Sequence, residues 1–283
     1  MYRKCITHQH RTAFILAIDC SASMQELITF NDMLMSKAEA VALACNYLID
    51  ELMARATRHD RVRNYCDIAV LGYFDNSVVS LLPCNDLISI SHLAEHSPEP
   101  RDYSFMQRID CSRTTTAHFT LHPWISALAQ GTTPMYEALI HIDELVGRWC
   151  SRPENRDSFP PMIFNITDGE CSDGNEMDLI SVAERIRSHR TSDGEALLFN
   201  IHLGTNDEEP RMLFPSDYEP QTSDPRRLLL MRMSSLLPES MEQYVDELIN
   251  PSTPAPYRCV AFNASIHILT MILNIGSQSI NNA

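Results

Sequence analysis

The chain has 283 residues, an apolar fraction of 44%, and a formal net charge of −15 at pH 7. This length is compatible with one large domain or two small ones, and the apolar fraction is sufficient for a full hydrophobic core. The acidic balance argues against nucleic acid or an anionic membrane as a partner, because both require a basic surface.

The cysteines and the N-terminal sequence indicate in which cellular compartment the protein is expected. The nine cysteines are odd in number and scattered, and no Cys-x-x-Cys pair is present. This pattern is typical of free thiols in a reducing environment. The N-terminus has no secretory apolar region, and the longest apolar runs are too short to span a bilayer. We therefore expect a cytoplasmic protein that does not enter a membrane.

The first half of the chain alternates predicted strands and a helix. The apolar run over residues 14–18 ends at Asp19 and is typical of a buried parallel strand. Apolar residues at helical spacing predict a long amphipathic helix over residues 31–57. Residues 67–74 are expected to form the next strand, with residues 77–82 as its hairpin partner.

Residues 83–130 form the least regular part of the sequence, and prolines there interrupt any long helix. Loops of this length are usually functional or disordered. The segment either borders the functional site or is a surface insertion, and the sequence leaves both interpretations open.

The second half continues the same alternation. Residues 204–224 are acidic and irregular, and a polar linker is expected over 151–158. The alternation of strands and helices predicts an α/β fold with a doubly wound, mainly parallel sheet and helices on both faces. The expected helices cover residues 133–149, 176–189, 225–237, 241–248 and 264–273, and the expected strands end at Asp168, Leu203 and Phe262.

Oxygen-bearing side chains follow the predicted strand ends. Asp19-x-Ser21-x-Ser23 places one carboxylate and two hydroxyls at the carboxyl edge of the sheet, where ligands bind in open α/β folds. Hard oxygen ligands of this kind suit Mg²⁺ or Mn²⁺. Asp168 at the next such strand end and Thr133 at a helix start supply further oxygens. The alternative is that these residues only cap loops and a helix.

Three short motifs carry a family resemblance. Asp19-x-Ser21-x-Ser23, Gly131-Thr-Thr-Pro-Met135 and Thr167-Asp-Gly169, in this order, resemble the von Willebrand factor A (VWA) domain. That family binds a divalent cation at a metal-ion-dependent adhesion site. The resemblance implies metal ligands at Ser21, Ser23 and Thr133, with Asp19 and Asp168 reaching the metal directly or through water. Thr133 is preferred to Thr132, because the family usually reads Gly-Gly-Thr and Thr132 replaces the second glycine.

The resemblance also implies an organisation. We expect one Rossmann-like VWA domain over residues 13–276 with one antiparallel edge strand. An N-terminal extension over 1–12, a long insertion around 83–130, an irregular acidic loop around 204–224 and a tail over 277–283 complete the chain.

A partner follows from the same resemblance. Members of the family share the cation with an Asp or Glu carboxylate of another protein, and Mg²⁺ is expected here, with Mn²⁺ or Ca²⁺ as alternatives. Residues 234–238 and 258–264, with Gly276, resemble intracellular bacterial members of tellurium-resistance, stress-response and phage-defence operons. Such proteins are often encoded beside a PP2C-type phosphatase and a Ser/Thr kinase. The rim that meets the partner is expected to contain Ala22, Met24, Thr132, Met135, Gly169 and Glu170.

Two other function classes stay open. Some intracellular relatives are adaptors for AAA+ ATPases, and a metal-dependent hydrolase could use Glu170 as a base. Phosphate-binding glycine loops and the Gly-x-Ser-x-Gly elbow do not occur in the sequence. We therefore expect an interaction module, not an enzyme.

Overall fold

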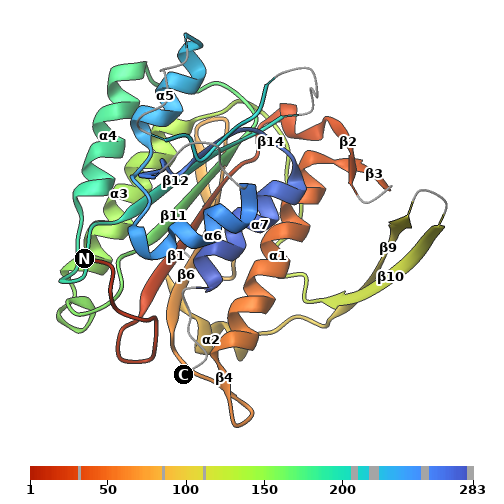
Figure 1. Ribbon diagram of the computed structural model, residues 1–283, viewed down its shortest axis with the longest axis horizontal. Helices are drawn as coiled ribbons and strands as arrows, with labels where there is room; N and C mark the ends of the chain where they lie inside the picture. Colours follow the sequence, from red (N-terminus) through yellow and green to blue (C-terminus); the bar gives the residue numbers. More distant parts are fainter. Residues whose placement is uncertain are drawn as a thin grey trace.

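The computed structural model describes residues 1–30, 33–84, 87–110, 113–204, 210–216, 223–249 and 255–278. Its centre is an eight-stranded sheet with the order β13-β14-β12-β11-β1-β6-β7, in which β8 also pairs with β6 (Figure 1). The central strands run parallel, as predicted for a doubly wound fold. They are β1 (Thr12–Asp19), β6 (Cys66–Phe74), β11 (Met162–Thr167), β12 (Leu197–Leu203) and β14 (Val260–Ala264).

Strand β1 lies where the winding of the sheet reverses. It pairs with β6 on one side and with β11 on the other, so that Ile18 lies opposite both Gly72 and Ile166. The chain fills the β6 side first and then returns to add β11, β12 and β14. Such a switch point opens a crevice at the carboxyl ends of the strands. Asp19, the last residue of β1, is therefore at the position where this fold class binds ligands.

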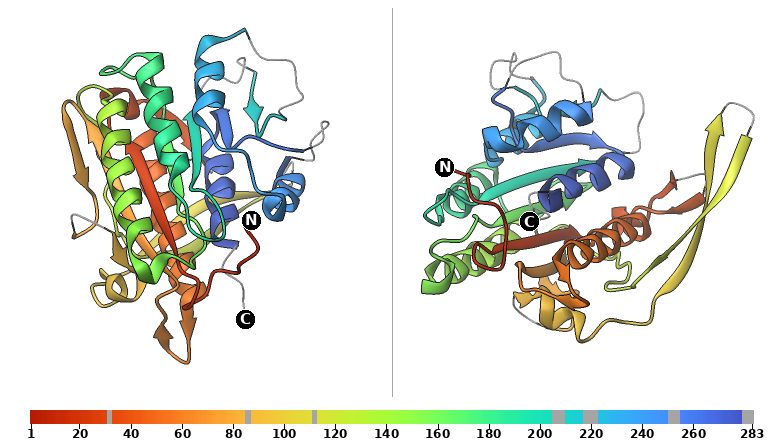
Figure 2. Two further views of the ribbon diagram at one scale, coloured as in Figure 1. Left: turned by 90° about the vertical axis from the view of Figure 1, so that its left-hand side faces the viewer. Right: turned by 60° about the horizontal axis from the view of Figure 1, so that its bottom comes forward.

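Helices cover both faces of the sheet (Figures 1 and 2). Alternate residues of β1 belong to two separate cores: Leu16 packs in the first core and Ile15 in the second. Because every residue of β1 is buried, its sequence is a continuous apolar run without alternation. The first core includes α1 (Lys37–Ala56), α6 (Glu239–Ile249) and α7 (Ile266–Gln278), and the second α3 (Met135–Ser151), α4 (Glu176–Ser188) and part of α5 (Pro225–Met233).

The sheet has antiparallel strands at both edges. The predicted edge strand is present as β7 (Ser77–Ser80), antiparallel to β6. The structure adds the short strand β8 (Ile88–Ser89) beside β6 and β13 (Met212–Leu213) beside β14. These two-residue strands are too short to be recognised by alternation of apolar residues.

The first helix starts later than predicted. Two short strands, β2 (Leu27–Phe30) and β3 (Met33–Ser36), pair antiparallel as a hairpin before the helix, and α1 begins at Lys37. Ser36 caps the helix, because its hydroxyl accepts from the Glu39 amide at 3.2 Å and its own amide donates to Glu39 Oε2 at 2.7 Å. The predicted start at Asn31 lies outside the described residues, and Leu34, counted toward the helix, is 69% exposed on the hairpin.

Residues 83–130 contain more regular structure than expected. They form the short helix α2 (Ile90–Ala94) and the antiparallel hairpin of β9 (Arg101–Asp110) and β10 (Arg113–Leu121). The hairpin projects from the body of the molecule (Figure 2, right). The end of this segment reaches the loop after β1, since the Ala129 carbonyl accepts from Gln25 Nε2 at 2.8 Å and the Gln130 amide donates to the Cys20 carbonyl at 2.7 Å.

Other boundaries differ by a few residues. The predicted linker over 151–158 begins within α3 and contains a 3-10 turn, Pro153–Asn155, and β4 (Thr57–Arg58) and β5 (Arg61–Val62) form a small hairpin after α1. Parts of the expected acidic loop, 205–209 and 217–222, and residues 279–283 of the tail lie outside the described residues. Among the helices that the structure describes, none has both the length and the apolar character needed to cross a bilayer.

Candidate metal site

Asp19 is held rigidly at the end of β1. Asp19 is fully buried. Its Oδ1 accepts a hydrogen bond from the Ser21 amide at 2.9 Å, and its Oδ2 accepts one from the Thr167 hydroxyl at 2.7 Å. Burial raises the pKa of Asp19 above its ordinary value; the hydrogen bonds from Ser21 and Thr167 oppose this shift, and the nearby Asp168 adds to it. A bound cation would favour the ionised form of this carboxylate.

The two serines link Asp19 to the second carboxylate. The Ser21 and Ser23 hydroxyl oxygens are 2.9 Å apart, and the Ser23 hydroxyl donates to Asp168 Oδ1 at 2.6 Å. Asp168 directly follows β11, the neighbour of β1 in the sheet. The side chains of the two loops therefore lie in contact, as predicted.

Thr133 reaches the same place from a third loop. A Cβ atom built on Gly169 would lie 3.6 Å from Thr133 Oγ1 and 3.9 Å from Ser23 Oγ, so both hydroxyls border Gly169. The hydroxyl of Thr132 instead donates to the Asp75 carbonyl at 3.4 Å. This orientation supports Thr133, and not Thr132, as the candidate ligand.

The Thr133 loop is fastened to the first loop by backbone bonds. The Ala22 amide donates to the Gly131 carbonyl at 3.0 Å, and the Gln130 amide donates to the Cys20 carbonyl at 2.7 Å. Gly131 has a φ of +69°, and a Cβ there would lie 1.9 Å from Asp75 Oδ1. A glycine is required at this position by both the backbone conformation and the space.

Lys37 is a member of the site that the sequence analysis missed. Its Nζ lies 2.9 Å from Asp168 Oδ2 and 2.5 Å from Glu26 Oε2. The Lys37 side chain is 6% exposed and that of Asp168 is fully buried. Burial lowers the pKa of Lys37, but Glu26 and Asp168 together outweigh it, and the net shift is upward. The Ser36–Glu39 capping pair could have placed Lys37 in the first turn of a helix, but not its contact with Asp168, 131 positions along the chain.

The donor set fits a divalent cation. Three hydroxyls and two carboxylates from three loops converge, and hard oxygen donors of this kind suit Mg²⁺. The ammonium of Lys37 shows that the position beside Asp168 accepts positive charge. A divalent ion would compete with this ammonium for the same carboxylate.

The expected rim is correct only in part with respect to exposure. Ala22, Thr132 and Glu170 are exposed, and Gly169 is half-buried. Met24 is fully buried and Met135 is 3% exposed, so neither side chain stands open at the surface as expected, although Met135 does line the hollow that includes Asp168. Both pack in the cores, because long apolar side chains beside a core gain more from burial than from exposure at a loop surface.

A buried row of polar side chains lies behind the site. The Tyr73 hydroxyl donates to Asn165 Oδ1 at 3.0 Å, Asn165 Nδ2 donates to Asn200 Oδ1 at 3.0 Å, and Asn200 Nδ2 donates to Ser234 Oγ at 3.0 Å. The row crosses β6, β11 and β12 and ends beside α5. Burial raises the pKa of Tyr73 well above its ordinary value. The row joins β6 and β11, the two neighbours of β1 in the sheet, to β12.

Acidic residues near the site have structural partners. Asp173 caps α3, since its carboxylate oxygens accept from the Tyr136 and Glu137 amides at 2.9 Å each. Glu176 pairs with Arg232 at 2.7 Å. The negative charges of Asp173 and Glu176 are therefore partly neutralised by these contacts with α3 and α5.

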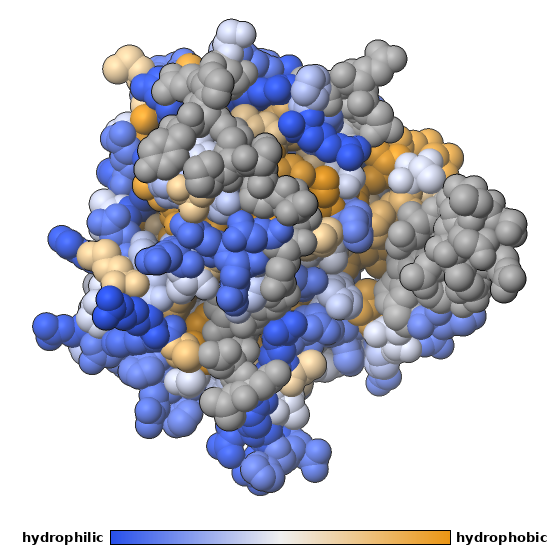
Figure 3. All heavy atoms as spheres, in the orientation of Figure 1, coloured by the Kyte–Doolittle hydropathy of each residue, from blue (hydrophilic) through white to orange (hydrophobic). Residues whose placement is uncertain are grey.

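Two surface hollows flank the site. One, of about 350 Å³, includes Asp168, Gly169 and Glu170 and extends toward α5. The other, of about 460 Å³, includes Lys37 and Arg211 and runs between β2 and the start of α7. Apolar surface gathers over the hairpin β2–β3 (Figure 3), where Leu27 is 60% exposed. Lys37 lines one hollow and Asp168, its ion-pair partner, lines the other, so each hollow begins at one member of the pair.

Comparisons with known proteins concern the fold. Family models and curated proteins contain no match to this chain. The von Willebrand factor type A structure from Catenulispora acidiphila is 14% identical with a TM-score of 0.43, over 69% of this chain and 34% of that one. The manganese-loaded TRAP protein of Plasmodium vivax is 14% identical with a TM-score of 0.37, over 72% of this chain and 61% of that one. The vWF domain of the pilus tip protein Mfa5 from Porphyromonas gingivalis covers 96% of both chains, at 10% identity and a TM-score of 0.48. At these identities the similarity to solved VWA structures concerns the fold alone.

Proposed function

We propose that this chain is a VWA-type interaction module that binds Mg²⁺ through Ser21, Ser23 and Thr133, with Asp19 and Asp168 completing the site. The observation that carries this proposal is the convergence of the three motif loops at the switch point of the sheet, with Lys37 already neutralising Asp168. Mn²⁺ and Ca²⁺ are the alternative cations.

The neutral ligands define the chemistry. When bound by hydroxyl oxygens, the cation keeps most of its charge and can accept a carboxylate from a partner protein. Asp19 is oriented by Ser21 and Thr167, so it stays fixed while the exposed side of the site remains open to that partner. Surrounding side chains must exclude water for such a contact to be strong. The two hollows beside Lys37 and Glu170 are the surfaces that could do this.

The partner is proposed to be a protein with an exposed Asp or Glu. By the sequence resemblance, we place the chain in the cytoplasm of a bacterium, in a tellurium-resistance, stress-response or defence complex with a PP2C-type phosphatase or a Ser/Thr kinase. An AAA+ ATPase is the alternative partner. Glu170 is exposed at the rim and not enclosed beside Asp19, which favours binding over metal-assisted hydrolysis.

The test compares Thr133→Ala, Asp19→Ala and Thr132→Ala. Thr132 is the matched control, because it is the adjacent threonine and its hydroxyl faces Asp75. Thermal unfolding is followed with Mg²⁺ and with EDTA, and partners are captured from the native cell under both conditions. We expect Mg²⁺ to stabilise the wild type and Thr132→Ala, and to leave Asp19→Ala unchanged. Thr133→Ala should lose Mg²⁺-dependent capture. Equal responses to Mg²⁺ in all four proteins would contradict the proposed site.

A further inference from the structure

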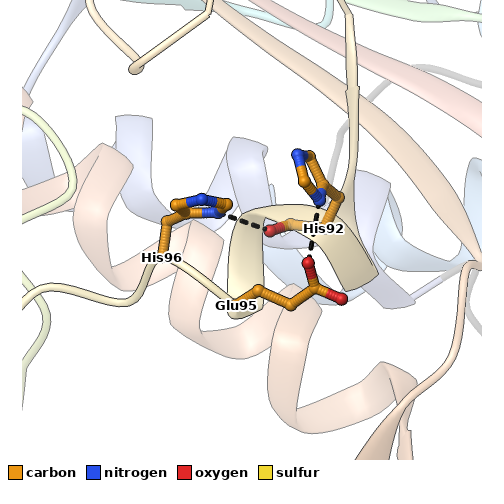
Figure 4. A group of neighbouring side chains, drawn as sticks. All are labelled: His92, Glu95 and His96. Carbon is orange, nitrogen blue, oxygen red and sulfur yellow. Dashed lines mark hydrogen bonds and ion pairs between the residues drawn. The ribbon is translucent and has the colours of Figure 1, made fainter.

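A second group of metal-ligating side chains lies at α2, far from Asp19. His92, Glu95 and His96 place one ligand atom each within 4.8 Å of one another (Figure 4). The His92 and His96 ring centroids are 5.0 Å apart with an interplanar angle of 74°. α2 lies toward the opposite end of the molecule from the hairpin β2–β3 that borders the first site (Figure 1).

The helix explains why these residues share a face. Ile90 and Leu93 are fully buried and anchor α2 to the core. α2 ends at Ala94, and Glu95 and His96 lie in the turn that follows, where the His96 amide donates to the Leu93 carbonyl at 2.9 Å. This turn continues the course of the helix, on which residues three and four positions apart lie side by side. His92, Glu95 and His96 therefore stand together on the solvent side, and all three are exposed. The exposure allows them to approach a dissolved ion without opening the fold.

The hydrogen bonds already orient one histidine for metal binding. His96 Nδ1 lies 3.1 Å from the His92 carbonyl oxygen. A carbonyl can only accept, so Nδ1 carries the proton and the neutral ring has its lone pair on Nε2. This backbone bond is the usual way in which a metal-binding imidazole is oriented. His92 Nδ1 lies 2.9 Å from Glu95 Oε2, which holds the carboxylate beside the ring.

A thiol borders the same place. Cys84 lines a surface hollow of about 660 Å³ together with His92 and His96. It lies in the segment that leads from β7 toward α2, and it is half-buried. A ligand set of Cys, two His and Glu contains the donor types of tetrahedral zinc sites.

We propose that His92, Glu95 and His96 bind Zn²⁺ and that Cys84 is the fourth ligand. Tetrahedral bonds of about 2.0–2.3 Å place neighbouring ligand atoms about 3.3–3.6 Å apart, so rotation of the exposed side chains of His92, Glu95 and His96 closes the gap from 4.8 Å. Cys84, which is not within 4.8 Å of all three ligand atoms, approaches them across the hollow. The Cys84 thiol gives up its proton to solvent when it coordinates. Imidazole and thiolate select Zn²⁺ over Mg²⁺, so this site and the Asp19 site take different metals. Zinc would fasten the segment after β7 to α2 at the sheet edge.

The test uses Co²⁺ as a spectroscopic probe and Zn²⁺ as the competing metal, on the full chain after treatment with chelator. We expect one equivalent of Co²⁺ to give the intense visible bands of tetrahedral coordination and a thiolate charge-transfer band, both removed by Zn²⁺. His96→Ala should weaken Zn²⁺ binding by more than the roughly 10–100-fold typical of an outer-shell change. Cys84→Ser should abolish the charge-transfer band.

Control variants separate this site from the others. His8→Ala with His10→Ala removes the histidines near the N-terminus, and Asp19→Ala removes a ligand of the proposed Mg²⁺ site; both should keep the Co²⁺ spectrum. Because His92, Glu95 and His96 are exposed, their substitution should leave the thermal midpoint without metal unchanged. Stoichiometric Co²⁺ binding that survives His96→Ala and His92→Ala, or its absence from the wild type, would overturn the proposal. A charge-transfer band that persists in Cys84→Ser would overturn the role of Cys84.

Discussion

Lys37→Met removes the ammonium that neutralises Asp168 while keeping an apolar stem of similar length. Because Asp168 is fully buried in its side chain and Lys37 is 6% exposed, the pair is a buried one. Removing one partner of a buried pair costs about 3–5 kcal/mol. For a chain of this size, about 2–4 °C accompanies each kcal/mol, so the thermal midpoint in EDTA should fall by about 6–20 °C.

The same variant should bind Mg²⁺ more tightly than the wild type. In the wild type, a divalent cation must compete with Lys37 for Asp168, whereas in the variant it relieves an unpaired carboxylate. If Mg²⁺ binding to Lys37→Met recovers only a third of the energy lost with the Lys37–Asp168 pair, about 1.4 kcal/mol, the dissociation constant for Mg²⁺ falls tenfold. Calorimetric titration with Mg²⁺ measures this change, and Mg²⁺ should restore much of the lost thermal stability.

Two controls isolate the role of the ammonium. Lys4→Met makes the same substitution at the other lysine of the chain, whose partner Asp157 has a 73% exposed side chain, and its thermal midpoint should stay close to that of the wild type. Glu26→Gln loosens the exposed side of the pair but leaves Lys37 on Asp168, so Mg²⁺ affinity should stay near that of the wild type. Equal or weaker Mg²⁺ binding by Lys37→Met, in a variant that still folds, would refute the competition between the ammonium and the cation.

Three further predictions concern stability. Asn165→Leu should lower the free energy of unfolding by about 2–5 kcal/mol, because Tyr73 and Asn200 would each lose a buried hydrogen-bond partner; urea unfolding measures this, and a loss below 1 kcal/mol would contradict it. Ser36→Ala should cost about 1 kcal/mol through loss of the cap of α1, whereas Ser188→Ala at the exposed end of α4 should cost less than half of that. Stability should also fall above pH 9: burial raises the pKa of Cys45 from 9.0 to about 12, so unfolding releases a proton between these values. Within this window, each pH unit should lower the free energy of unfolding by about 1.4 kcal/mol through Cys45. Urea unfolding at pH 8 and pH 10 measures this loss, which should be smaller in Cys45→Ala than in the wild type.

Much of the fold could be predicted from local sequence. The buried parallel strands are continuous apolar runs, and polar residues mark where they end, as at Asp19 and Asp168. Ser21 and Ser23 could be assigned to the Asp19 site because they lie within four residues of it. Thr133 and Asp168 joined them through the motif order, and the orientation of the Thr132 hydroxyl toward Asp75 agrees with the choice between the threonines.

Short elements escaped sequence analysis for a different reason. α2 has five residues and β8 has two, which is less than the length over which a period of apolar residues can be recognised. The spacing of His92, Glu95 and His96 was visible in the sequence. Without a helix at that place, nothing indicated that the three side chains share a face.

The sequence by itself determined which segments become strands and which oxygen-bearing residues stand at their ends, because both depend on neighbours a few positions away. Only the tertiary structure decided that Lys37 pairs with Asp168 and that Met24 and Met135 turn inward. These outcomes depend on which surfaces meet after the sheet has assembled. Burial and ion pairing depend on contacts between residues far apart in the sequence. A local sequence pattern carries no information about which distant residues will be in contact.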